Sequence, residues 1–220
     1  MKRLLGILAL SALTTSLFAQ GLVQFNNLQG TGPVKQWTSA SDQTPIPIPK
    51  TAAGVVNGRV DVLTFYNSTT ASLTPMFSSV ANGVTTSYTT LGSFLAANPG
   101  WVDSASAAIG SLQNGVFNAA VLTLGTSNPG ASVSYAIAGW TGNYATWDLA
   151  LASQNSMMGI SSVFTTASGN PLTTPPGTAI SISGGFTGLT LSTVIPVPEP
   201  ASFALAGLGL AALVAFRRRS

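Results

Sequence analysis

The chain has 220 residues, enough for one domain of ordinary size with its own core. Only 6% of the residues are charged, and the net charge of +3 arises at the ends, where Lys2, Arg3 and Arg217–Arg219 are five of the eight basic residues. The segment between the ends, residues 20–195, holds three basic and four acidic side chains. A nucleic-acid surface needs clustered Lys and Arg to displace counterions, so nucleic acid is excluded as a partner.

The chain contains neither cysteine nor histidine. Disulfides, thiol nucleophiles and thiolate metal sites are therefore excluded, and so is a Ser-His-Asp triad. The domain must be held together by packing and by the hydrogen bonds of its sheets. We predict no cofactor and no metal site.

The first nineteen residues are typical of a secretory signal peptide. A basic start is followed by the apolar stretch Leu4–Leu13, then by three polar residues, Thr14–Ser16, and by Leu17, Phe18 and the small Ala19. This apolar stretch is too short for an ordinary membrane anchor. We therefore predict an N-terminal signal helix over residues 1–19, export by the secretion machinery, and cleavage by signal peptidase between Ala19 and Gln20.

The middle segment has the pattern of short strands. Apolar residues alternate with others around Val60–Val62, Val116–Leu124 and Val133–Ile137. Turn signals such as Asn57-Gly58 separate these runs. The pattern predicts a mainly β domain over residues 20–195, an antiparallel β-sandwich of the Ig-like or jelly-roll-like type.

Two stretches of this domain are predicted to be short helices. Asp103–Leu112 begins with an aspartate that could cap a helix, and Thr146–Ser153 begins with a threonine that could do the same. The proline run Pro45–Pro49 is predicted to be an extended, stiff loop or crossover. No repeat of fixed period is present, which excludes a solenoid or a propeller.

The last 25 residues, 196–220, form a separate segment. Pro198, Glu199 and Pro200 cannot lie in a helix, because proline lacks an amide donor and restricts the residue before it. Residues 201–216 are apolar except for Ser202, and we predict that they form a C-terminal transmembrane helix. Such a helix would be about 24 Å long, shorter than a ~30 Å hydrocarbon core, so local thinning of the bilayer would have to accommodate it.

Three basic residues, Arg217, Arg218 and Arg219, follow this apolar stretch. Their side chains can extend to the membrane interface. Because positive charge stays on the cytoplasmic side of a membrane, the domain is expected on the opposite, periplasmic side.

Together, Pro198-Glu199-Pro200, the apolar stretch and the terminal arginines resemble the PEP-CTERM sorting domain of Gram-negative bacteria. The resemblance implies that an exosortase, a membrane protease-transferase, recognises Pro198, Glu199 and Pro200 and that the arginines act as a retention signal. It also implies that the tail is removed near the motif while the protein moves from the inner membrane to the cell surface or beyond. A plain C-terminal membrane anchor is the alternative.

The middle segment resembles a large group of uncharacterised PEP-CTERM proteins. The resemblance rests on the order of five segments: Val23–Asn27, Val133–Trp140, Tyr144–Trp147, Gly159–Phe164 and Pro175–Thr178. It implies no known activity.

An enzyme would have to rely on the few carboxylates of the domain. Asp103 and Asp148 could supply a catalytic pair, but each serves equally well as a charge at the start of a helix. A structural calcium ion would need clustered oxygens, whereas Asp42, Asp61, Asp103 and Asp148 are separated in the sequence, although folding could bring two of them together. We predict no catalytic residues and expect that the protein is not an enzyme.

Two tryptophans, Trp101 and Trp147, are the candidates for ligand binding, because indole rings can stack on sugars. They could instead fill the core. The expected function is that of an exported surface or extracellular-matrix protein associated with exopolysaccharide or biofilm. The alternative is a carbohydrate-binding module displayed at the cell surface.

Overall fold

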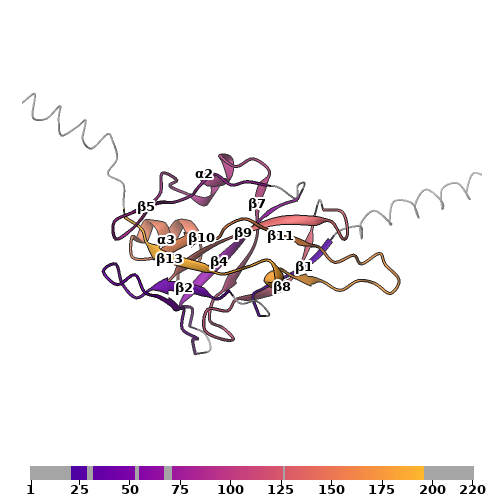
Figure 1. Ribbon diagram of the computed structural model, residues 1–220, viewed down its shortest axis with the longest axis horizontal. Coiled ribbons are helices and arrows are strands. Elements are labelled where there is room, and N and C mark those ends of the chain that lie inside the picture. The colour runs from indigo at the N-terminus through magenta and orange to yellow at the C-terminus, as the bar shows by residue number, and fades with distance from the viewer. Residues whose placement is uncertain (1–20, 29–31, 53–54, 67–70, 126, 196–220) are drawn as a thin grey trace, which may run out of the picture.

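The computed structural model describes residues 21–28, 32–52, 55–66, 71–125 and 127–195 (Figure 1). Strands dominate them, which confirms the predicted mainly β class. The strands are β1 (Gly21–Asn26), β2 (Val34–Trp37), β3 (Pro45–Pro47), β4 (Gly58–Phe65), β5 (Ser78–Val80), β6 (Gly83–Thr85), β7 (Trp101–Ala108), β8 (Asn118–Leu124), β9 (Ser132–Thr141), β10 (Met157–Ile160), β11 (Phe164–Ala167), β12 (Ile180–Ser181) and β13 (Leu189–Thr193). The helices are α2 (Leu91–Ala96), α3 (Trp147–Ser153) and the 3-10 helix η2 (Ile182–Gly184).

The largest sheet has the strand order β3-β2-β13-β10-β9-β4-β7, and β11 also pairs with β9. The long strand β9 lies at its centre, and its residues from Val133 to Trp140 are all buried. β4 pairs antiparallel along one side of β9, while β10 and β11 pair with successive parts of the other side. Because both faces of β9 are covered, its side chains alternate between two cores instead of between a core and water.

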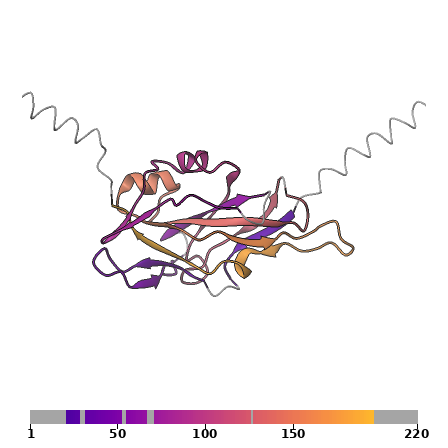
Figure 2. The same cartoon turned by 45° about the horizontal axis from the view of Figure 1, so that its top comes forward.

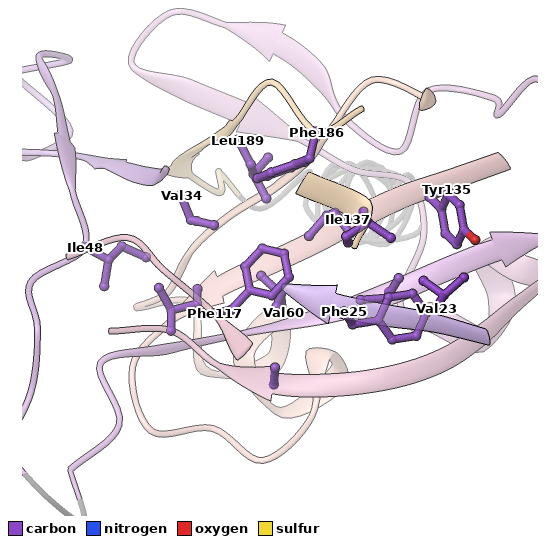
Figure 3. Packing of buried hydrophobic residues seen from close by; sticks show 14 of the residues in the cluster. Val23, Phe25, Val34, Ile48, Val60, Phe117, Tyr135, Ile137, Phe186 and Leu189 are labelled. Carbon is purple, nitrogen blue, oxygen red and sulfur yellow. The ribbon is translucent and has the colours of Figure 1, made fainter. Parts of the chain in front are cut away.

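The first core, here called the sheet core, lies between the large sheet and a small sheet of order β12-β1-β8 (Figure 3). Val23 and Phe25 of β1 pack there with Val60 of β4 and Ile137 of β9, and all four are fully buried. Phe25 meets Tyr135 edge to face, with ring centroids 6.1 Å apart. The alternation predicted for β4 and β9 therefore has its expected cause, burial against a second layer.

The second core, here called the helix core, lies on the opposite face of the large sheet, which α2 and α3 cover (Figure 2). The small side chains of Ala136 and Ala138 on β9 leave room for the helices to approach. Phe94 of α2 and Ala150 of α3 pack against them, together with Trp140. The helices thus form a third layer of the domain.

The predicted type of sandwich is not confirmed. Two strand pairs are parallel, β1 with β12 and β2 with β13, so the sheets are mixed and not purely antiparallel. In addition, one face of the large sheet packs against helices and not against a sheet. These layers therefore do not confirm the Ig-like or jelly-roll-like arrangement that the sequence pattern led us to expect.

The two helix predictions had different outcomes. Helix α3 is confirmed: Thr146 precedes it in extended conformation, and its hydroxyl accepts a hydrogen bond from the backbone nitrogen of Leu149. The helix predicted over Asp103–Leu112 is wrong, because most of this stretch is strand β7, paired with β4. Helix α2, with Thr90 at its start, was not predicted.

The proline run is extended, as predicted, but its first part is the strand β3. β3 pairs antiparallel with β2 and forms the last strand on that side of the large sheet. Proline fits an edge strand, because only one side of such a strand has to supply hydrogen-bond donors.

The two ends of the described domain lie far apart. β1 lies toward one end of the longest axis, whereas the end of β13 lies toward the other (Figures 1 and 2). The chain therefore enters the domain at one end and leaves it at the opposite end.

Candidate functional site

Two aspartates come together on the helix side of the large sheet, and we call them the aspartate pair. Asp61 lies in β4 between Val60 and Val62, whose side chains enter the sheet core. Successive side chains of a strand point to opposite faces, so Asp61 points to the other face. Asp103 of β7 lies opposite Leu63, a residue of the helix core, and therefore shares that face with Asp61.

The carboxyl group of Asp61 titrates far above its ordinary range. Burial raises the pKa of Asp61 to about 7, and the nearby charge of Asp103 adds to this shift. A hydrogen bond from Ser106 and the charge of Arg59 lower the pKa, but they do not outweigh burial. Partial burial also raises the pKa of Asp103, although this residue lies at an exposed position of β7. The aspartate pair therefore binds a proton near neutral pH.

Access limits what the aspartate pair can do. Two carboxyl groups with separated pKa values can act as acid and base. However, Asp61 is only 6% exposed, so a substrate would meet Asp103 alone. In the part of the chain that the structure describes, no three His, Cys, Asp or Glu side chains gather where they could hold a metal ion.

The sequence had suggested a different pair, Asp103 with Asp148. Asp148 lies in the first turn of α3, where a negative charge suits the helix dipole. Its carboxylate accepts a hydrogen bond from the backbone nitrogen of Leu91, 2.7 Å away, and so ties α3 to the first residue of α2. Asp61 was missed as the partner of Asp103, although its place between two core valines signals that it points to the other face.

The two tryptophans that were candidates for stacking on sugars both lie in the core, which is the alternative that the sequence had left open. Trp101 is 4% exposed and Trp147 is 2% exposed. Trp147 stands edge-on to Trp140, with ring centroids 6.1 Å apart, and the indole nitrogen of Trp101 donates a hydrogen bond to the carbonyl of Ser72 at 3.1 Å. Trp101 borders an open pocket of about 400 Å³ but shows little of its surface there. Burial of such large rings stabilises the fold more than exposure to water would. Neither ring is therefore available to bind a sugar, and the carbohydrate-binding alternative loses both of its candidates.

The last described residues are fastened to the domain by a hairpin. β5 and β6 form this hairpin, and Asn82 in its turn takes a positive φ of 66°. The backbone nitrogen of Ile195 donates a hydrogen bond to the carbonyl of Val84 at 2.8 Å, and Val194 pairs with Val84 in parallel. We call this contact the C-terminal clasp. It extends the pairing of the chain beyond Thr193, where β13 ends, to residue 195.

A pocket of about 250 Å³ opens beside the clasp. Its lining comes from three places: the loop before α2, the end of α3 and the clasp itself. The lining residues are Thr86, Tyr88, Thr89, Leu151, Ala152, Gln154, Val194 and Ile195. None of them is charged, so the pocket is suited to an uncharged, largely apolar contact.

The clasp depends on close approach at Gly83. A Cβ atom added there would press against the carbonyl oxygen of Thr193 and lie 3.0 Å from the side chain of Ile195. We expect Gly83→Ala to loosen the clasp and to speed hydrogen exchange of the Ile195 amide about tenfold or more. Gly184→Ala is the control, because a Cβ at Gly184 meets nothing within 4 Å. Equal exchange rates in the two variants would contradict this account of the clasp.

The predicted cleavage and sorting residues lie outside the described residues: Ala19, Gln20, Pro198, Glu199, Pro200, Arg217, Arg218 and Arg219. The same is true of the signal helix predicted over residues 1–19 and of the transmembrane helix predicted over residues 201–216. Among the helices that the structure does describe, none has the length and apolar character needed to cross a membrane.

Comparison with known families and proteins gives one match. Residues 196–219 match the family described as the PEP-CTERM protein-sorting motif. Neither the curated proteins nor the solved structures include a match to this chain. The family match supports a protein that is exported, anchored in a membrane as a precursor and processed by an exosortase. The chain thus carries a PEP-CTERM protein-sorting motif, which begins at the residue directly after the C-terminal clasp.

Proposed function

We propose that this protein is a non-enzymatic component of the cell surface or extracellular matrix, delivered there by an exosortase. The observation that carries the proposal is the sorting motif at residues 196–219. In the proposed sequence of events, the secretion machinery exports the chain and signal peptidase removes residues 1–19. The segment 201–216 then holds the precursor in the inner membrane with its domain in the periplasm.

The character of the domain supports a structural role. Its titratable pair offers only one accessible carboxyl group, because Asp61 is buried. The domain carries few charges and many Ser, Thr and Asn side chains, which give a polar, nearly neutral surface. Such a surface can hydrogen-bond to the hydroxyl groups of an exopolysaccharide without strong attraction to ions. Exopolysaccharide is therefore the proposed surrounding of the mature protein.

The sorting step can be tested through Glu199. We expect the wild-type protein, isolated from its host, to lack residues 1–19 and the arginine tail, as measured by intact mass. A Glu199→Ala variant is expected to keep its tail and to remain in the inner-membrane fraction. Asp42→Ala, which removes an exposed carboxylate elsewhere, is the control and should be processed like the wild type.

A wild-type protein that keeps Arg217–Arg219 and stays in the inner membrane would contradict the proposal. The segment 196–220 would then be a plain anchor, and the domain would belong to the periplasmic face of that membrane. Normal processing of the Glu199→Ala variant would instead contradict the assigned role of Glu199 in recognition.

A further inference from the structure

The sorting motif begins very close to a fixed point of the domain. Ile195 is hydrogen-bonded to Val84, and the motif starts at the next residue. Pro198 is three residues beyond Ile195, and a chain extends at most ~3.3–3.6 Å per residue. Pro198 therefore lies within about 11 Å of Ile195, and Pro200 lies within about 18 Å of it.

These distances are short compared with the size of an enzyme. Even a small folded domain is about 30 Å across. An enzyme that binds Pro198, Glu199 and Pro200 must therefore lie against the end of the domain where the clasp is. The pocket beside the clasp, lined by Tyr88, Leu151 and Ala152 among others, opens at this end.

We propose that the clasp and its pocket form a docking surface for the enzyme that processes the sorting motif. This inference rests on the proposed function, since it assumes that such an enzyme acts on residues 198–200. The pocket fits a partner surface with uncharged, apolar side chains, because none of its lining residues is charged. Recognition then involves the folded domain as well as the short motif.

A charge placed in the pocket tests the proposal. Ala152 lines the pocket at an exposed position of α3, so Ala152→Glu alters the docking surface without entering a core. We expect precursor processing in host cells, followed by pulse-chase, to be about tenfold slower in this variant, a typical effect of one disrupted interface contact. Leu149→Glu is the control, because Leu149 is 55% exposed on the same helix and does not line the pocket. It should be processed at the wild-type rate.

A spacer distinguishes the loss of docking from a disturbance of the fold by Ala152→Glu. Six Gly and Ser residues inserted between Ile195 and Pro196 would let an enzyme reach the motif without touching the domain. In this background we expect Ala152→Glu to be processed as fast as its parent. Two results would contradict the proposed docking surface. One is that Ala152→Glu without the spacer is processed at the wild-type rate, and the other is that Ala152→Glu slows processing equally with and without the spacer. The Glu199→Ala variant distinguishes the two proposals. If Glu199→Ala blocks processing while Ala152→Glu does not, the proposed sorting holds and the docking surface is contradicted. A wild-type protein that is not processed at all would contradict both proposals.

Discussion

An Asp61→Asn variant is expected to lose most of the pH dependence of stability between pH 4 and pH 7. In the folded wild type, burial raises the pKa of Asp61 from 3.8 to about 7. Well below pH 3.8 the carboxyl group is protonated in both the folded and the unfolded state, so it does not affect the free energy of unfolding. As the pH rises, the unfolded chain releases the proton first, so the folded state loses stability until the pH passes about 7. The full shift corresponds to about 4 kcal/mol, an upper limit, at 1.36 kcal/mol per pKa unit.

Denaturant unfolding at pH 4, 5.5 and 7.5 measures this effect. The free energy of unfolding of the wild type should fall across the series, whereas that of Asp61→Asn should stay nearly level and exceed the wild-type value at pH 7.5. Asp42→Asn is the control, because hydrogen bonds with Thr44 lower the pKa of Asp42 and its contribution changes only at acidic pH. If Asp61→Asn kept the slope of the wild type, another group would have to be responsible.

A Trp147→Ala variant is expected to lower the free energy of unfolding by about 3–5 kcal/mol, the usual cost of removing a large buried aromatic ring. The ring is 2% exposed and contacts Trp140 and Phe77, whose ring centroids lie 6.1 and 5.6 Å away. Removing it leaves a cavity between α3 and the large sheet. Chemical denaturation at constant pH measures the loss.

The control for this prediction is Leu149→Ala, on the same helix. Leu149 is 55% exposed, so its truncation should change the stability by less than about 0.5 kcal/mol. A stable Trp147→Ala variant would contradict the assignment of Trp147 to the core and would return it to the role of an exposed, ligand-binding ring.

Local sequence patterns predicted those elements that depend on neighbouring residues. The alternation around Val60–Val62 and Val133–Ile137 identified β4 and β9, and Thr146 marked the start of α3. The sorting motif was equally accessible, because its signal lies in one continuous segment and needs no folded context. Each of these features depends only on residues that are close together in the sequence.

The failures share a cause, which is pairing or packing with distant parts of the chain. Asp103 could start a helix, but in the folded domain its segment pairs antiparallel with β4 and forms the strand β7. The partner of Asp103, Asp61, is 42 positions away in the numbering, and only the strand register brings the two to one face. For Trp101 and Trp147 the choice between ligand stacking and core filling stayed open, because no local pattern indicates that helices cover the second face of the sheet.

The separation of β1 from the end of β13 determines which end of the domain the membrane anchor of the precursor leaves free. In the membrane-anchored precursor, the sorting segment 196–219 holds the domain at its clasp end, so β1 lies toward the end remote from this anchor. The end with β1, and not the clasp, is therefore the part of the precursor that is free of the anchor. A peptide label placed just before Gly21 would accordingly lie at the end of the domain opposite the anchor.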